Sequence, residues 1–289
     1  MNQYLKILLF GLLVFGGCED EPDSFEVSKV PSTFTKKVLM EEFTGAWCGY
    51  CPDGAHRVEN LINDKDGRVV AVSLHAGNPT GDAMEIAHTN YLETTYQNPE
   101  YPSGYPSGMV DRVSVNGSTR LNRGYWEYVA NDQLLETAVC GLAIISEVNG
   151  QNATVEVHAG FNSTFNGDYR LSVYLIEDGI TGTGYGYDQR NYYNTEAESS
   201  FYDLGDPIVG YEHNHTLRAV LSESLGDAIM VSEMVSGGEH IKTYTVDISS
   251  YNKNNLSIVD FVTYMGSSIT EHEILNVQKC GIDSLQDWD

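Results

Sequence analysis

Two cysteines separated by two residues, Cys48 and Cys51, constrain this chain more than any other feature of its sequence. They follow an apolar run over residues 38–43 and a turn of small residues, and Pro52 comes next. This order predicts a strand, a tight turn and a helix that begins at the cysteines. A thiol in the first helical turn faces unpaired backbone N–H groups and the positive end of the helix dipole. Both favour the thiolate, which is the attacking species in disulfide exchange, so the motif predicts redox chemistry.

The two sulfurs would have different roles. Cys48 would attack a partner's sulfur, or be attacked by it, and Cys51 would resolve the mixed disulfide. Half of a zinc site and an inert structural disulfide remain as alternatives. A zinc site needs a second ligand pair at similar spacing, and the sequence has neither a second Cys-x-x-Cys nor histidines separated by three to five residues.

The stretch around the cysteines resembles the thioredoxin superfamily. In that family a carboxylate on the preceding strand sits behind the second cysteine, and Glu42 matches its position, where Asp is more usual. Strand alternation puts Glu41 and Glu42 on opposite faces, so a solvent-facing Glu42 is the alternative. A buried Glu42 would have a raised pKa and could take the proton of Cys51.

The same resemblance implies a cis-proline opposite the cysteines. Pro106 is the candidate and Pro102 its competitor, and the choice rests on the family because cis X-Pro bonds are a minority. Pro106 and Tyr105 would bind the backbone of the partner, and Trp47 and Tyr50 complete the expected site. Tyr50 replaces the Pro common in reducing members and the His common in oxidising ones, so the redox direction stays open.

Residues 1–17 predict an export signal, since Lys6 precedes an apolar core over 7–15 that is too short to span a bilayer. The small residues before Cys18 resemble a lipoprotein signal, which implies a lipid on Cys18; an ordinary cleaved signal peptide is the alternative. We expect residues 18–36 to form an acidic, flexible tether. Its acidic start resembles surface-export signals of Bacteroidetes lipoproteins, and either face of the membrane remains open.

The other two cysteines, Cys140 and Cys280, are expected to form a structural disulfide. It would close a loop of about 140 residues and stabilise the fold by roughly 4–5 kcal/mol. Two separate buried thiols are the alternative, since the sequence does not show whether the two Cα atoms lie close together.

The pattern of predicted elements changes near Cys140. Strands and helices alternate over residues 37–139, with helices expected over 52–63, 82–96 and 124–137, which predicts an α/β thioredoxin-like domain. Eight apolar, alternating runs over 140–289, one of them over 228–235, predict the strands of an immunoglobulin-like β-sandwich domain. A connection over 178–213 is rich in Tyr, Gly and acidic residues, and such long loops commonly carry function or an interface.

A net charge of −25 excludes a nucleic-acid partner, because the chain would repel phosphate. No cofactor is required by the redox chemistry, although the acidic residues of 178–213 could hold calcium. His213 and His215 are candidates for a metal site that His240, His272 or Asp227 would complete, and a polar strand face is the alternative.

The chain as a whole resembles Bacteroidetes outer-membrane lipoproteins related to the 28-kilodalton outer membrane protein. The resemblance rests on residues 42–52, on residues 105–108 with Arg112, and on residues 211–218. It implies a thioredoxin-like domain, a β-rich domain and placement in the outer membrane, and it leaves the activity open. From the cysteine motif and the signal we expect a lipid-anchored thiol-disulfide oxidoreductase that acts on exported cysteine-containing proteins or peptides. A non-enzymatic binding lipoprotein in an outer-membrane protein complex, with a structural Cys48–Cys51 disulfide, is the alternative.

Overall fold

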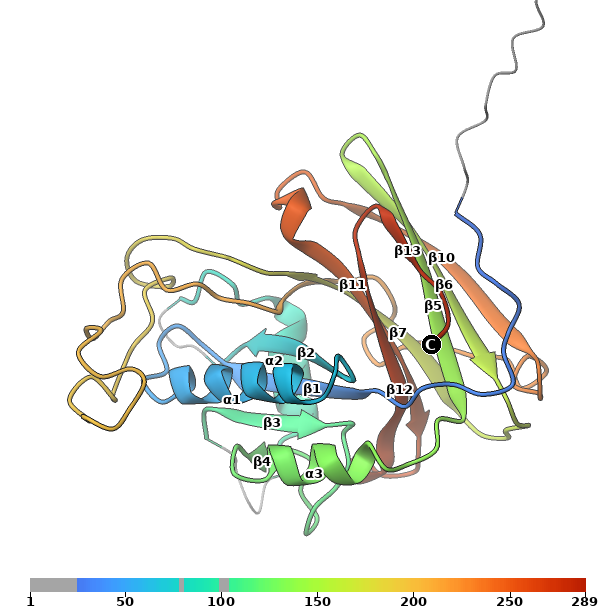
Figure 1. The fold of residues 1–289 in the computed structure, drawn as a ribbon, viewed down its shortest axis with the longest axis horizontal. Helices are drawn as coiled ribbons and strands as arrows, with labels where there is room; N and C mark the ends of the chain where they lie inside the picture. Colours follow the sequence, from blue (N-terminus) through green and yellow to red (C-terminus); the bar gives the residue numbers. More distant parts are fainter. Residues whose placement is uncertain (1–24, 78–80, 99–103) are drawn as a thin grey trace, which may run out of the picture.

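The computed structural model describes residues 25–77, 81–98 and 104–289, and its strands form two sheets (Figure 1). In the nine-stranded sheet the order is β12-β11-β7-β8-β2-β1-β3-β4, with β9 paired to β7. In the four-stranded sheet it is β10-β6-β5-β13. The larger sheet contains β1 (Val38–Thr44), β2 (Val69–His75), β3 (Ser107–Val110), β4 (Leu121–Asn122), β7 (Tyr169–Glu177), β8 (Thr216–Val220), β9 (Asp227–Ala228), β11 (Leu256–Met265) and β12 (His272–Gly281). The smaller sheet contains β5 (Cys140–Asn149), β6 (Asn152–Phe161), β10 (Glu239–Asp247) and β13 (Ser284–Gln286), and the α-helices are α1 (Cys51–Asp64), α2 (Ala87–Thr95) and α3 (Trp126–Gln133).

The pairing of strands corrects the predicted fold class. An α/β thioredoxin-like domain followed by an immunoglobulin-like sandwich is wrong, because strands from before and after Cys140 share the larger sheet. β8 pairs in parallel with β2 through Ser73 and Thr216, and the N–H of Ser73 donates to the carbonyl of His215 at 2.7 Å. In the described chain, strand residues far outnumber those of the three α-helices. Local alternation identifies strands, but it does not say which distant strands pair.

Most individual elements nevertheless lie where the sequence places them. The helix expected over residues 52–63 is α1, and the helices expected over 82–96 and 124–137 are the shorter α2 and α3. Residues 228–235 were expected to form a strand, but only Ala228 belongs to one, and turns follow it. The chain there closes on itself, since the N–H of Glu233 donates to the carbonyl of Met230.

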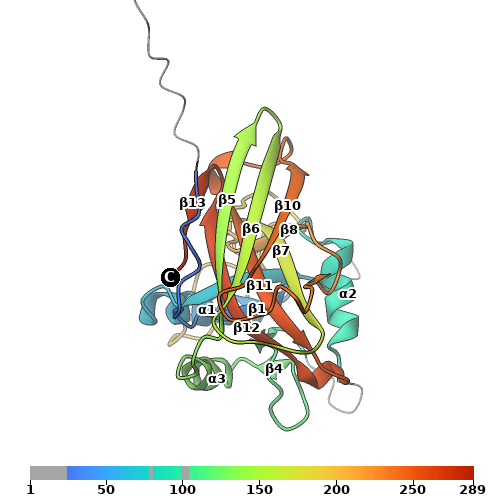
Figure 2. The ribbon, with the colours of Figure 1, turned by 90° about the vertical axis from the view of Figure 1, so that its right-hand side faces the viewer.

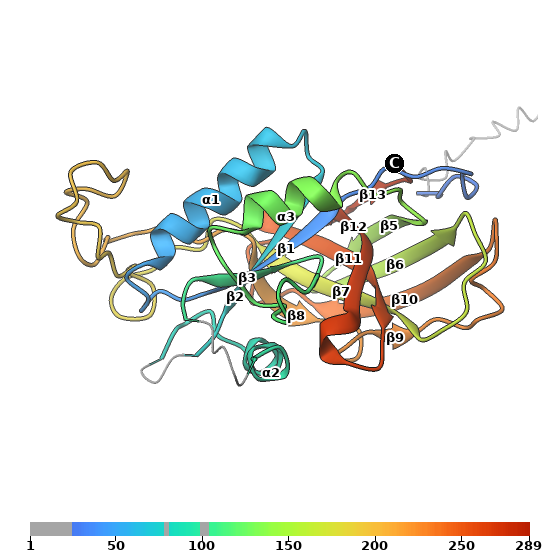
Figure 3. The ribbon, with the colours of Figure 1, turned by 90° about the horizontal axis from the view of Figure 1, so that it is seen from below.

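Strand β1 separates two hydrophobic cores. Its residues Leu39 and Phe43 pack on one side with α2, whereas Val38 and Met40 pack on the other with α1 and α3. Figure 3 shows α1 and α3 together on one face of the sheet and α2 on the opposite face. This alternation sends the two adjacent glutamates of β1 to opposite faces.

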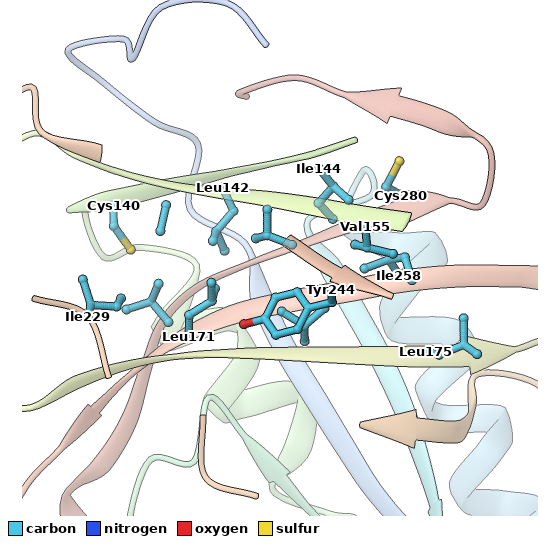
Figure 4. Close-up of a cluster of buried hydrophobic side chains, with 14 of the residues drawn as sticks. Cys140, Leu142, Ile144, Val155, Leu171, Leu175, Ile229, Tyr244, Ile258 and Cys280 are labelled. Atoms are coloured by element: carbon cyan, nitrogen blue, oxygen red, sulfur yellow. The ribbon is translucent and has the colours of Figure 1, made fainter. Parts of the chain in front are cut away.

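A third core lies between the smaller sheet and strands β7 and β11 (Figure 4). Cys140 and Cys280 both belong to it as free buried thiols, so the expected disulfide does not form. The side chain of Asn276 in β12 donates to the carbonyl of Cys140 at 2.9 Å. Cys280 lies four residues further along β12, a rise of roughly 13 Å. That distance exceeds the Cα separation that a disulfide can bridge.

The described part of the expected tether packs against the C-terminal end of the chain (Figure 2). The indole N–H of Trp288 donates to the carbonyl of Ser28 at 2.8 Å. Lys36 is buried, and its Nζ lies 2.5 Å from Oδ2 of Asp111. The chain from Ser28 onward is therefore part of the folded body rather than a flexible tether.

The export signal, Cys18 and Pro102 lie outside the described residues. None of the helices in the described ranges combines the length and the apolar character needed to cross a membrane.

Candidate functional site

The two central cysteines lie where β1 ends and α1 begins, and they form a disulfide. Cys51 is the first residue of α1, and Pro52 follows it in the first turn, where the missing N–H costs no helical hydrogen bond. The N–H of Cys48 donates to the carbonyl of Gly45 at 3.0 Å, which holds the turn. Cys48 is 4% exposed and Cys51 1% exposed. After reduction, the N-terminus of α1 favours a thiolate at this position.

Glu42 lies behind the disulfide, on the face of β1 that packs against α1. It is fully buried and lines the same cavity as Cys51. The helix passes close to the carboxyl because residue 54 is glycine, and a Cβ on Gly54 would lie 2.2 Å from Oε1 of Glu42. This oxygen has no hydrogen-bond partner among the described residues. Burial raises the pKa of Glu42 to about 8, against the attraction of His215, so the carboxyl holds a proton at neutral pH.

Pro106 lies beside Glu42 against the same helix. The Tyr105–Pro106 peptide is cis, as the resemblance implied. A Cβ on Gly54 would also lie 2.8 Å from Cβ of Pro106, so the proline ring contacts the first turns of α1. Tyr105 packs edge-on against Trp47, with ring centroids 4.9 Å apart. The structure therefore brings Glu42, Trp47, Tyr105 and Pro106 together around the disulfide.

The connection over residues 178–213 completes the site. Tyr50 stacks edge-on against Tyr192 and Tyr193, with centroids 5.0 and 5.8 Å apart. The side-chain amide of Gln189 donates to the carbonyl of Cys48 at 2.8 Å. The sequence signals this segment only through its length and composition, because no local pattern indicates which of its residues contact the cysteines.

A cavity of about 210 Å³ lies behind the disulfide, between α1 and residues 211–215. His75 lines it, and its Nδ1 lies 2.9 Å from Oδ2 of Asp82. The same oxygen accepts the N–H of Ala46 at 2.8 Å. Although burial opposes it, these hydrogen bonds lower the pKa of Asp82. The ionised Asp82 therefore fixes both the histidine and the turn that carries the cysteines.

His213 and His215 also line this cavity, but each has its own partners. Burial lowers the pKa of His213 to about 4, so it is neutral, and its Nε2 donates to the carbonyl of Tyr187 at 2.8 Å. His215 lies 3.1 Å from carboxylate oxygens of both Glu59 and Asp178. Although burial opposes it, these carboxylates raise the pKa of His215. The described residues contain no group of three His, Cys, Asp or Glu side chains arranged to hold a metal ion.

The side chains expected to supply a third metal ligand have other partners. His240 Nδ1 lies 2.7 Å from a carboxylate oxygen of Glu233, and Asp227 pairs with Lys242 at 3.0 Å. His272 lies in β12, on the far edge of the larger sheet from the disulfide.

Comparisons with known proteins concern most of the chain. A family model described as outer membrane protein Omp28 matches residues 93–286. The solved structure of HBP35 of Porphyromonas gingivalis is similar, with a TM-score of 0.66 and 19% identity over 87% of this chain and 76% of that one. A crystal structure of an Agrobacterium tumefaciens protein gives a TM-score of 0.53 and 13% identity over 86% and 96% of the two chains. The search of curated proteins finds no match. At these sequence identities the two matches show that the folds are related, and they do not indicate an activity.

Proposed function

We propose that this chain, which belongs to the outer membrane protein Omp28 family, exchanges disulfides with exported cysteine-containing proteins of the cell envelope. Exported proteins meet oxidising conditions, in which disulfides form and persist. One observation carries the proposal: the proton-holding carboxyl of Glu42 lines the same cavity as Cys51, with an oxygen that no other described group uses. A buried acid whose pKa is near the working pH suits proton transfer to and from a thiol.

Oxidation of a partner dithiol would proceed in two balanced steps. A partner thiolate attacks Sγ of Cys48, the S–S bond breaks, and Cys51 leaves as a thiolate that takes the proton of Glu42. The second partner thiolate then attacks its neighbour's sulfur in the mixed disulfide, and Cys48 leaves as a thiolate. The partner loses two electrons and gains a disulfide, while Cys48 and Cys51 are reduced. The reverse sequence, in which Glu42 accepts the proton, reduces a partner.

A Cys51→Ser variant should accumulate mixed disulfides with envelope proteins, because Cys48 can still attack but nothing resolves the adduct. Affinity purification under non-reducing conditions, followed by release with dithiothreitol, would reveal the trapped proteins. The matched control is the Cys48→Ser/Cys51→Ser double variant, which lacks both sulfurs. Equal amounts of adduct from the two proteins would contradict the proposed exchange.

A non-enzymatic binding lipoprotein is the second candidate. It is favoured by the burial of both sulfurs and by exposed apolar side chains on the connection over 178–213, such as Tyr185 and Val209, which are 64% and 74% exposed. Such side chains suit contact with another outer-membrane protein. The reduction potential of the folded pair separates the two functions. A value below roughly −300 mV is that of a structural disulfide, whereas roughly −270 to −120 mV is the range of exchange catalysts.

A lipid on Cys18 is the membrane anchor in this proposal. Cells fed a labelled fatty acid should label the native protein but not a Cys18→Ala variant. Labelling of both proteins, or of neither, would refute the anchor.

A further inference from the structure

A short segment of the 178–213 connection, residues 188–193, lies directly on the turn that carries the cysteines; we call it the strap. The N–H of Arg190 donates to the carbonyl of Ala46 at 2.8 Å. Two residues later the N–H of Tyr192 donates to the carbonyl of Gly49 at 2.9 Å. Two main-chain hydrogen bonds therefore hold the strap across the turn, one near each end of it.

Gln189 adds a buried side-chain contact between the same two segments. It is 2% exposed. Its amide nitrogen lies 2.8 Å from the carbonyl oxygen of Cys48 and 3.2 and 3.3 Å from those of Gly45 and Ala46. The side chain therefore joins the strap to the turn at the residue that carries the first sulfur.

Aromatic packing closes the other end of the turn. Tyr192 lies so close to Gly49 that a Cβ there would be 2.4 Å from the ring. Only glycine permits this approach. Tyr50 meets the same ring edge-on, as described above.

Hydrogen bonds also join the strap to the rest of the connection. Gln189 and Ile208 exchange two backbone hydrogen bonds, at 3.1 and 2.7 Å. The buried amide of Asn191 donates to the carbonyls of Phe201 and Gly205, both at 2.9 Å. These bonds are internal to the connection. The segment from the strap to Ile208 can therefore leave the turn as one unit once two further contacts break, the hydrogen bond from Arg123 to the hydroxyl of Tyr193 and the packing of Phe201 on His56.

We propose that the strap is a displaceable cover that occupies the backbone positions where an extended segment of a redox partner docks. This inference rests on the proposed function and deepens it. When the strap dissociates from the turn, main-chain N–H groups of the partner donate to the carbonyls of Ala46 and Gly49 in its place, and a sulfur of the partner reaches Cys48. This structure is then the closed state, in which Cys48 is only 4% exposed. The partner that fits is an unfolded or extended polypeptide with a free main-chain edge, rather than a folded surface.

The kinetics of disulfide reduction test this cover. With dithiothreitol in excess, the rate for the native protein should level off at the rate at which the strap opens. Tyr192→Ala and Gln189→Ala should each raise this limiting rate of disulfide reduction at least several-fold. The increase should be roughly 10-fold for Gln189→Ala, because that variant loses more than one hydrogen bond to the turn. Tyr202→Ala is the matched control, because Tyr202 belongs to the same connection and is 49% exposed, as is Tyr192. Equal rates for all four proteins would overturn the proposal.

Hydrogen exchange on the native protein keeps the test independent of the stability of the variants. The amides of Arg190 and Tyr192 should exchange through a local opening, much faster than the amides of β1. Exchange of both amides only on global unfolding would overturn the cover. Neither the reduction kinetics nor the hydrogen exchange needs a protein substrate. If the strap opens in both measurements but the Cys51→Ser variant traps no protein, the redox function is refuted and the cover is not.

Discussion

Replacing Glu42 by glutamine is expected to slow the reduction of the Cys48–Cys51 disulfide roughly 100- to 1,000-fold at pH 7. The leaving thiolate of Cys51 needs a proton, and the buried carboxyl of Glu42 lines the same cavity and is protonated at this pH. Glutamine keeps the shape of the side chain but has no acidic proton. The measurement is alkylation of freed thiols after a timed exposure to dithiothreitol, at concentrations where the native rate is still proportional to reductant.

The pH dependence of stability gives a second readout of the same residue. Burial raises the pKa of Glu42 from 4.5 to about 8, so the folded state binds this proton more tightly than the unfolded chain. The associated stability is fully present below pH 4.5 and is lost as the pH rises to about 8. Relative to the Glu42→Gln variant, the free energy of unfolding should fall by about 3–5 kcal/mol across that interval.

The control for Glu42 is a second buried carboxyl. Asp260 in β11 is fully buried, burial raises its pKa, and it does not line the cavity behind the disulfide. Asp260→Asn should alter the pH dependence of stability and leave the rate of disulfide reduction unchanged. If Glu42→Gln were reduced as fast as the native protein, Glu42 would have no role in proton transfer.

Replacing Arg112 by methionine is expected to lower the free energy of unfolding by about 3–5 kcal/mol. Arg112 is 1% exposed, and its guanidinium binds both carboxylate oxygens of Glu41, at 2.7 and 2.8 Å. It also donates to the hydroxyl of Tyr96 at 2.9 Å and lies over the ring of Phe261. Removing it leaves the Glu41 carboxylate buried without its counter-charge. Denaturation in urea, with a constant slope, would measure the loss.

Two further variants distinguish the cost of leaving a buried charge unpaired from the cost of removing a side chain. Glu41→Leu combined with Arg112→Met should lose less stability than the sum of the single losses, because neither partner is left unpaired. Arg57→Met removes an exposed guanidinium that pairs with Asp53 at 2.9 Å and should cost no more than about 0.5 kcal/mol. Additive losses at Glu41 and Arg112 would mean that the pair is not energetically coupled.

The sequence predicts the elements of this fold better than their arrangement. The apolar period of residues 38–43 and the proline after Cys51 are local signals, and they predict β1 and the start of α1. The parallel contact of Ser73 with Thr216 is not local, since it joins strands separated by the whole middle of the chain. The two-domain prediction was wrong because the change from alternating elements to consecutive strands near Cys140 is not a boundary between sheets.

In the candidate site, too, the residues set by local patterns were predicted and those from distant segments were not. Cys48 and Cys51 are fixed by the turn and the start of α1, so a motif with a strand before it suffices to predict their grouping. The choice of Glu42 over Glu41, like that of Pro106, came from the resemblance. The strap residues, by contrast, reach the turn from a connection more than a hundred residues later. The pairing of Cys140 with Cys280 failed for a related reason, because counting cysteines carries no information about the distance between them.

The contact between residues 25–36 and the C-terminal end of the chain would also set the orientation of a molecule anchored through its N-terminus. This segment runs beside β13, whereas the turn at the start of α1 and the connection that covers it lie at the opposite end of the long axis (Figure 1). A chain held to a bilayer through the residues before 25 would therefore present its disulfide outward, at the membrane-distal tip. Such a tip would meet polypeptides in the surrounding aqueous space more readily than neighbours embedded in the same leaflet.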